Sequence, residues 1–176
     1  IPHVLGSGLM DLLTNQTSWK SVCGNTELMI AFGGLPAFNS QISNGGTGAH
    51  IQRLGARNAA AAGTRFVNIS PRRSDLKNDI PEHWLQVRPN TDVSVMLGMA
   101  HTLIVKQLVD VSFLNRFTTG FERFQSYLLG KTDGIPKTAA WAASISGIAA
   151  ADIISLTEEM AKKRTMLSVS WSLTRQ

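Results

Sequence analysis

The sequence predicts an α/β fold, a Rossmann-like three-layer sandwich in which helices flank a mostly parallel sheet. Residues 28–32, LMIAF, form an apolar run suited to a strand that is buried on both faces. Along the rest of the chain, strand patterns alternate with loops and helical patterns, as they do in parallel sheets covered by helices. The length of 176 residues, with 43% hydrophobic and 16% charged residues, suits one domain with a sizeable core. We therefore expect residues 1–176 to form a single domain.

The strand at residues 28–32 is followed by Gly33 and Gly34, which allow the backbone to turn sharply and to approach a neighbour closely. Further strands are expected at the short apolar runs that end at turn residues. They cover residues 65–70, 83–87 and 166–170. The Ser-, Asn- and Gly-rich residues 40–48 are expected to form a loop.

Helices are expected where alanine content, capping residues or apolar spacing favour them. Residues 1–25 read as irregular, with one short helix. Asn90 or Thr91 is expected to be the N-cap of one helix, with Asp92 in its first turn, and Thr138 that of another, which Gly147 ends. The helical patterns cover residues 50–62, 93–107, 111–117, 121–129, 138–147 and 149–163.

The formal net charge of +5 is unevenly distributed, with six basic and two acidic residues up to Arg73. This suits an anionic partner such as a phosphate. The chain has no dense Lys/Arg run with interleaved aromatic residues, so we do not expect a nucleic-acid partner. Cys23 is the only cysteine, which excludes a disulfide within the chain. No apolar run approaches the roughly 20 residues of a membrane span.

Three strand ends are expected to converge on one rim of the sheet: residues 32–39, 69–73 and 90–92. A nucleotide would use the glycine turn for close approach, Arg72 or Arg73 for phosphate, and Asp92 for a ribose or guanine edge. Each feature also has a simpler interpretation, namely an ordinary turn, a solvated arginine pair and a helix-dipole partner. Neither GxGxxG nor GxxxxGK[ST] is present. The residue pattern alone thus indicates binding of a nucleotide-like anion.

Residues 88–103, RPNTDVSVMLGMAHTL, strongly resemble the bis-molybdopterin guanine dinucleotide S- and N-oxide reductases, the group of dimethyl sulfoxide, trimethylamine N-oxide and biotin sulfoxide reductases. The resemblance continues through residues 113–148 and 164–176, and is looser in the first half, at PHVLGS and FGGLPAFNSQ. It implies that the chain is an internal α/β domain, a fragment of a longer enzyme, and one of two Rossmann-like domains that hold the guanine dinucleotide ends of the paired pterins.

The resemblance also implies a set of cofactor-binding residues, in three loops and at the end of the chain. Phe32 stands where the family has Trp, and Leu35 where it has Asn or Asp, so a hydrogen bond from that side chain is lost. The serine that ligates molybdenum lies before this chain, so no metal ligand and no catalytic residue are expected. The implied set is Phe32, Gly33, Gly34, Leu35, Pro36, Asn39, Ser70, Arg72, Arg73, Asn90, Thr91, Asp92, Trp171 and Arg175.

The function that the resemblance implies is reduction of an S-oxide or N-oxide by oxygen-atom transfer at a bis(molybdopterin guanine dinucleotide)-molybdenum cofactor in the full-length enzyme. The expected partners are the remaining domains of the same polypeptide, the oxide substrate and an unidentified electron donor. We expect the isolated chain to be inactive and empty of cofactor. Two alternatives stay open: a non-catalytic nucleotide-binding or interaction module, and a domain of another molybdopterin enzyme such as formate dehydrogenase or nitrate reductase. The compartment, bacterial cytoplasm or periplasm, is undecided, with a lean to cytoplasm.

Overall fold

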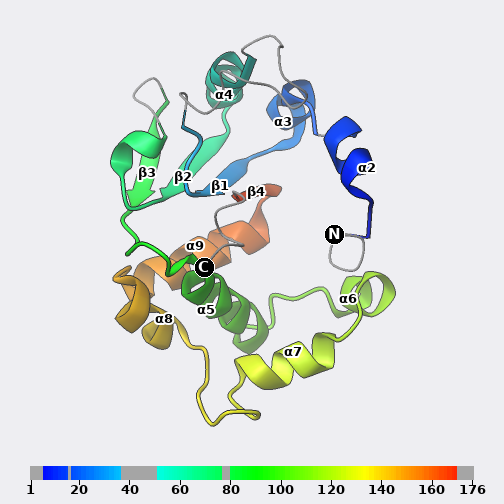
Figure 1. Ribbon diagram of the computed structural model, residues 1–176, viewed down its shortest axis with the longest axis vertical. Helices are drawn as coiled ribbons and strands as arrows, with labels where there is room; N and C mark the ends of the chain where they lie inside the picture. Colours follow the sequence, from blue (N-terminus) through cyan, green and yellow to red (C-terminus); the bar gives the residue numbers. More distant parts are fainter. Residues whose placement is uncertain (1–5, 16, 37–50, 77–79, 170–176) are drawn as a thin grey trace.

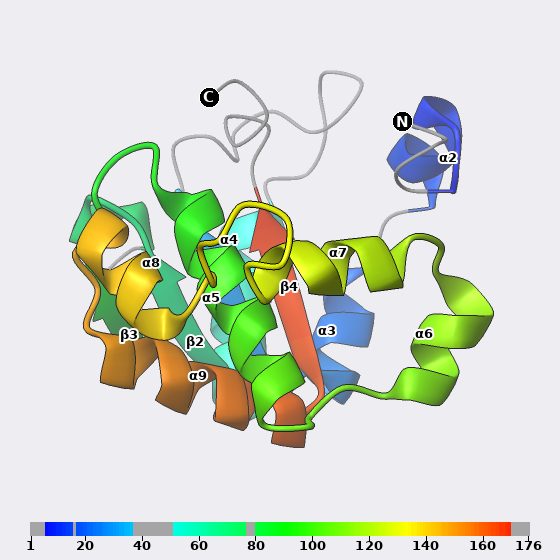
Figure 2. The same ribbon diagram turned by 90° about the horizontal axis from the view of Figure 1, so that it is seen from below.

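The computed structural model describes residues 6–15, 17–36, 51–76 and 80–169. In this part of the chain, a four-stranded sheet lies between two layers of helices (Figures 1 and 2), which confirms the predicted α/β sandwich. All the strand pairs are parallel, in the order β3-β2-β1-β4. The strands are β1 (Leu28–Phe32), β2 (Arg65–Ile69), β3 (Glu82–Leu85) and β4 (Thr165–Val169).

The register of the sheet brings the carboxyl ends of the four strands to one edge. Phe32 at the end of β1 pairs with Ile69 of β2 and with Val169 of β4, and Ile69 pairs with Leu85 of β3. We call this edge, with the residues that directly follow these strands, the rim. The loop after β2 starts between those after β1 and β3.

One face of the sheet packs against three helices, α5 (Asp92–Val105), α8 (Ala139–Ser146) and α9 (Ala150–Lys162). Leu28 and Ile30 of β1 are fully buried on this side, against Ile153 and Leu156 of α9 among others. The alternation of side chains along β1 places Met29 on the opposite face. The apolar run thus fills both cores, as predicted for a strand buried on both faces.

The other face packs against α3 (Trp19–Asn25) and α4 (Ile51–Ala61). These two helices approach so closely that a Cβ placed on Gly55 would lie 2.2 Å from the Trp19 ring. The expectation of a single short helix in residues 1–25 is wrong, because the structure has both α2 (Leu9–Thr14) and α3. Ser18 caps α3 by accepting from the Ser21 N–H at 3.2 Å, and Val22 is buried beneath α4.

The remaining elements are α6 (Val111–Phe117), α7 (Phe121–Leu128) and a short 3-10 turn, η2 (Arg73–Asp75). The predicted cap of α8 is confirmed, since the Thr138 hydroxyl accepts from the Trp141 N–H at 3.0 Å. Gly147 ends that helix in a left-handed conformation, with φ of +82°. None of the described helices is both long and apolar enough to cross a membrane.

Candidate functional site

The loop after β1 turns at the glycine pair and packs against the chain itself. The Gly33 N–H donates to the Ile69 carbonyl at 2.9 Å, and the Leu35 N–H donates to the Asp75 carbonyl at 2.7 Å. Gly34 has φ of +72°, and a Cβ there would lie 2.2 Å from the Asp75 carbonyl oxygen. The close approach that the glycines were expected to permit is therefore made to η2.

Two side chains of this first loop point into the cores rather than to the rim surface. Phe32 is 3% exposed and belongs to the core beneath α5. Leu35 packs against the α3–α4 core, which explains why this position can be apolar. Gly33, Gly34 and Pro36 are half-buried, and they present backbone to the rim.

Ser70, directly after β2, is fully buried and orders the second loop. Its hydroxyl donates to the Asp75 carboxylate at 2.5 Å and accepts from the Arg72 N–H at 3.3 Å. Its carbonyl accepts from the indole N–H of Trp84 at 2.9 Å. The hydroxyl thus makes two hydrogen bonds within the turn, and the contact of Ser70 with a cofactor stays a prediction.

Arg72 and Arg73 place two guanidinium groups at the rim, with side chains 67% and 72% exposed. The Arg72 Nε lies 3.7 Å from the Asp75 carboxylate, and the Arg73 Nε lies 3.4 Å from that of Glu82. Ion pairs with such an exposed cation are worth little. They set the direction of each arginine and leave most of both guanidinium groups open to an anion.

The segment after β3 is tied to the end of α8 by Arg88. The Arg88 Nη1 donates to the carbonyls of Ser144 and Ile145 at 3.0 and 3.1 Å, and its backbone N–H donates to the Ser146 carbonyl at 2.9 Å. A cation at this position satisfies carbonyls at the helix end and complements the macrodipole. Arg88 therefore fixes the start of the third loop.

Thr91 precedes α5, but its side chain does not cap the helix. Thr91 is the N-cap residue of α5, as predicted, but its hydroxyl donates to the Arg88 carbonyl at 2.7 Å instead of accepting from a backbone N–H of the helix. Asn90, the other predicted cap, instead occupies the left-handed region with φ of +64°. Within the described residues, no side chain caps the start of α5, which leaves a positive helix end at the rim.

Asp92 lies in the first turn of α5 and is half-buried. Its carboxylate makes no hydrogen bond or ion pair with the described part of the chain. The rim therefore combines a carboxylate acceptor, an uncapped helix end and two exposed guanidinium groups. These are the donors and acceptors that a nucleotide needs for its base and phosphates.

The titratable groups with shifted pKa among the described residues lie away from the rim. Burial lowers the pKa of His101, on α5, so its imidazole is neutral at pH 7. Hydrogen bonding to Lys106 lowers the pKa of Glu158, on α9. In the described ranges, no group of three or more His, Cys, Asp or Glu residues could hold a metal ion.

Comparison with known proteins identifies relatives along the whole chain. It is 38% identical over 177 residues to the trimethylamine-N-oxide reductase of Haemophilus influenzae, and 38% identical over 175 residues to the dimethyl sulfoxide/trimethylamine N-oxide reductase of Rhodobacter capsulatus. These alignments cover 100% and 99% of the chain. It is also 37% identical over 155 residues to the biotin sulfoxide reductase of Cereibacter sphaeroides, which covers 88% of the chain.

The chain is a segment of the S- and N-oxide reductase family. It spans about a fifth of the length of these relatives, 21% in each case. No protein-family model matches it. Acetylene hydratase from Pelobacter acetylenicus has the same fold, with a TM-score of 0.57 and 21% identity over 86% of the chain and 19% of that protein.

In this reductase segment, the structure brings together the three predicted loops, because their strands are parallel neighbours. Val169 ends β4 at the same rim, beside Phe32. Asn39, Trp171 and Arg175, the other predicted cofactor contacts, lie outside the described residues. The assignment of individual cofactor contacts stays a prediction.

Sequence reasoning missed the residues that position the rim of the reductase segment. Asp75 joins the first two loops, and Arg88 anchors the third. Asn68 of β2 is fully buried, and its Nδ2 donates to the Glu82 carboxylate at 3.2 Å and to the Arg73 carbonyl at 3.4 Å. Its Oδ1 has no partner among the described residues. Of these three residues, only Asn68 could have been noticed in the sequence, because it is a polar residue inside an apolar strand pattern.

Proposed function

We propose that this chain binds one guanine dinucleotide arm of a bis(molybdopterin guanine dinucleotide) cofactor, in an enzyme that reduces an S-oxide or an N-oxide. The support for this enzyme class is the 37–38% identity to three reductases named for such oxides. Since the chain spans a fifth of their length, turnover belongs to a longer polypeptide whose other domains are its partners.

One observation carries the assignment of the dinucleotide end to this chain. The Asp92 carboxylate has no partner among the described residues and stands at the uncapped start of α5, at the same rim as Arg72 and Arg73. A guanine ring presents adjacent N–H donors at N1 and N2, which one carboxylate can accept together. We assign guanine recognition to Asp92, with Asn90 and Thr91 shaping the turn beside it.

The phosphates require cations and backbone N–H donors, and both are available at the rim. We assign phosphate binding to Arg72 and Arg73, whose guanidinium groups can form paired hydrogen bonds with phosphate oxygens. Backbone of the first loop, Gly33 to Pro36, borders the same turn through the contact of Leu35 with Asp75. The buried Phe32 and Ile69 beneath the loops exclude water from their base.

When bound, the molybdenum centre of the cofactor would supply the oxygen-atom transfer and the two-electron chemistry. The residues of this chain bind and orient the dinucleotide, and so fix the position of the cofactor relative to the other domains. Their contribution to the rate is positional, because a cofactor that tilts at its far end no longer holds its reactive end in place.

The test is the Asp92→Ala variant of the full-length enzyme. We expect the purified variant to contain less molybdenum and less acid-released guanine nucleotide than the wild type. Asp152→Ala is the matched control, because Asp152 lies in the first turn of α9, so its replacement also removes a helix-dipole partner, and it is not one of the residues assigned to the dinucleotide. Equal molybdenum and guanine contents in both variants and the wild type would contradict the assignment.

A further inference from the structure

The helix α6 exposes apolar side chains and has no buried residue. Val111 is 54% exposed, Phe113 54% and Phe117 61%, and Phe124 on the following helix α7 is 44% exposed. The rings of Phe113 and Phe117 lie 4.9 Å apart, so they form one apolar patch. We call Phe113, Phe117 and Phe124 the α6 patch.

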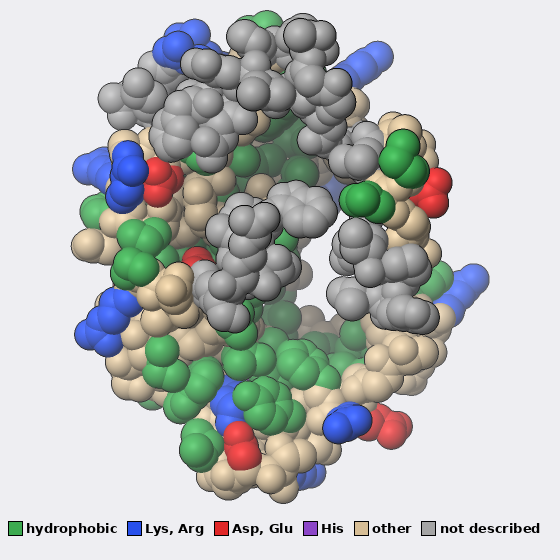
Figure 3. Space-filling model, viewed as in Figure 1, with side chains coloured by type: hydrophobic (Ala, Val, Ile, Leu, Met, Phe, Trp, Pro, Cys, Tyr) green, Lys and Arg blue, Asp and Glu red, His purple; other side chains and the backbone are tan. Residues whose placement is uncertain are grey.

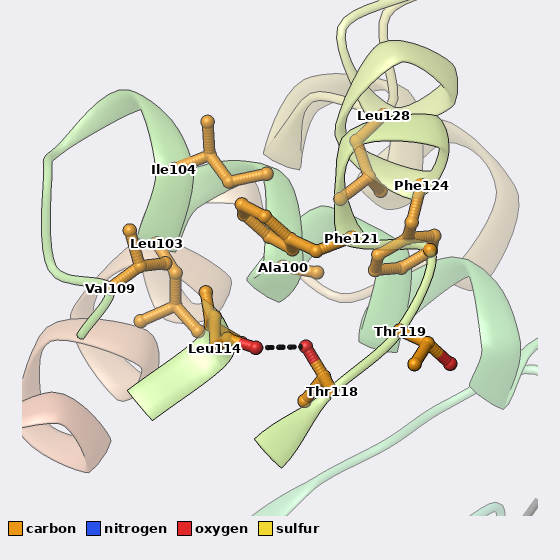
Figure 4. A pocket seen from close by; sticks show the side chains of 11 residues that line it. Ala100, Leu103, Ile104, Val109, Leu114, Thr118, Thr119, Phe121, Phe124 and Leu128 are labelled. Atoms are coloured by element: carbon orange, nitrogen blue, oxygen red, sulfur yellow. Dashed lines mark hydrogen bonds between the residues drawn. The ribbon is translucent and has the colours of Figure 1, made fainter. Parts of the chain in front are cut away.

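A groove of about 370 Å³ opens beside this patch, between α5, α6 and α7. Figure 4 shows its walls, which include Leu103 and Ile104 of α5, Leu114 of α6, and Phe121 and Phe124 of α7. The Thr118 hydroxyl donates to the Leu114 carbonyl at 2.7 Å, so it is already used within the chain. None of the described residues that line the groove is charged. It therefore suits an apolar group.

Hydrophobic side chains also gather over α5 and α7 on the face shown in Figure 3. A small apolar ligand in the groove would leave Phe113 and Phe117 of the α6 patch in water. A protein segment can fill the groove and cover the patch together, and extended exposed apolar surfaces mark such contacts. The breadth of the apolar surface thus favours a protein partner over a small ligand.

The local interactions of α6 are too few to hold this helix firmly in place. Helices of fewer than about 12 residues are marginal without tertiary packing. Here seven residues have one cap, the Asp110 carboxylate, which accepts from the Phe113 N–H at 2.9 Å, worth about 1 kcal/mol. Packing against a further segment would supply the tertiary contacts that a helix as short as α6 needs for stability.

The curated relatives offer such a segment, because the chain matches only 21% of their length. Permanent interfaces are more apolar than transient ones and resemble a domain core cut in half. The α6 patch and the groove have this composition.

We infer that the α6 patch and the groove are the docking surface for an apolar segment of the remaining polypeptide of the same reductase chain. This segment inserts an aliphatic or aromatic side chain between α5 and α7 and covers Phe113 and Phe117. The inference rests on the proposed function in one respect, since it places the chain within a longer reductase.

The test replaces Phe113 of the full-length enzyme with the photo-reactive p-benzoylphenylalanine. After irradiation, we expect a cross-link that leaves the polypeptide at the mass of a monomer, and mass spectrometry should find the second peptide outside the region matched by this chain. Asn115 is the matched position, because it is exposed on the same helix but lies about 200° around it from Phe113. The same probe at position 115 should give at least tenfold less product.

Three outcomes would overturn the inference. They are a product of twice the monomer mass, a product with another protein, and a yield at Phe113 no higher than at Asn115. A second measurement compares thermal unfolding of the full-length double variant Phe113→Ser/Phe117→Ser with Asn115→Ser. The double variant should unfold several degrees lower, and equal midpoints would contradict a buried patch.

These outcomes are independent of the cofactor assignment. A missing cross-link with a loss of guanine in Asp92→Ala would refute the docking surface alone. The expected cross-link with unchanged cofactor in Asp92→Ala would refute the nucleotide assignment alone.

Discussion

The carbonyl oxygen of Asp75 accepts a hydrogen bond from the Leu35 N–H at 2.7 Å, which joins the loop after β1 to the turn after β2. The carboxylate of the same residue accepts from the Ser70 hydroxyl and pairs with Arg72. One residue therefore couples the glycine turn to an arginine that we assign to phosphate binding.

Replacing Asp75 with Ala should loosen the turn after β2, because it removes the carboxylate and keeps the backbone carbonyl that accepts from the Leu35 N–H. Ser70 is fully buried, so its hydroxyl would lose a charged acceptor that water cannot replace, at about 1–3 kcal/mol. We expect a lower denaturation midpoint and a lower guanine content in the full-length enzyme. Asp75→Asn retains an acceptor oxygen and should lose less of both. The prediction fails if Asp75→Ala matches the wild type in stability.

Gly34→Ala should destabilise more than an ordinary glycine replacement. A non-glycine residue in the left-handed region costs about 1–3 kcal/mol. At Gly34 the added Cβ would also overlap the Asp75 carbonyl oxygen, 2.2 Å away, so η2 must shift. Gly134 is a close control, because its φ is +74° and no atom lies within 4 Å of an added Cβ. Urea denaturation of both variants measures the difference, and equal losses would argue against tight packing at Gly34.

Neutralising the rim arginines in the double variant Arg72→Gln/Arg73→Gln should weaken cofactor retention with little loss of stability. Both guanidinium groups are exposed, and the carboxylates of Asp75 and Glu82 keep their hydrogen bonds from Ser70 and Asn68, so the loss of stability should be small. Dialysis at rising salt concentration should release guanine nucleotide earlier from the variant, because the remaining attraction is weaker. Arg164→Gln is the control, since that side chain is 68% exposed and lies beside Glu27 at the opposite edge of the sheet. If both variants release guanine nucleotide at the same salt concentration, Arg72 and Arg73 do not bind the phosphates.

Lys137→Met should destabilise the turn between α7 and α8. The Lys137 ammonium is buried, donates to the Ile135 carbonyl at 2.6 Å and lies 4.5 Å from the centre of the Tyr127 ring. Losing these two contacts costs about 2 kcal/mol. Lys131→Met, in the same turn with an exposed side chain, should have a small effect. Thermal unfolding measures both, and similar midpoints would contradict the prediction.

The stability that Lys137 contributes should depend on pH. The hydrogen bond that the Lys137 ammonium donates to the Asp133 carboxylate lowers the pKa of Asp133 below the ordinary value of 3.8. Because the folded state prefers the ionised carboxylate, this contribution is present above pH 3.8 and is lost as the pH falls through the lowered pKa. The stability difference between wild type and Lys137→Met should therefore shrink on acidification from pH 5 to below 3. A constant difference would show that Asp133 does not contribute.

The sequence predicted the strands and most helices because their signals are local. The apolar run of β1, the cap of α8 by Thr138 and the periodicity of α5 are each contained in a few residues. The strand β3 begins one residue earlier and ends two residues earlier than expected. Val87 is buried outside that strand, so its apolar character did not indicate strand pairing. The helix α3 was missed because its burial depends on α4, far along the chain.

The position of the rim was predictable for a similar reason, since parallel strands bring their carboxyl ends to one edge. The contacts that shape it were not predictable. Arg88 reaches the end of α8 across 56 and 57 residues, and no spacing in the sequence marks that pair. Gly34 was correctly expected to allow close approach. The sequence did not show that the approach is made to Asp75, because the position of Asp75 depends on how η2 packs.

The pairing of β4 with β1 also determines when the sheet can be completed during synthesis. The Arg164 N–H just before β4 donates to Glu27 just before β1, across 137 residues. At 5–20 residues per second, a ribosome needs roughly ten seconds to make that stretch. Through this interval β1, one of the most buried strands, has one edge open, because β4, the strand that pairs with it there, has not been made. This sheet is therefore most exposed to misassembly before β4 emerges, and the rim is completed after that.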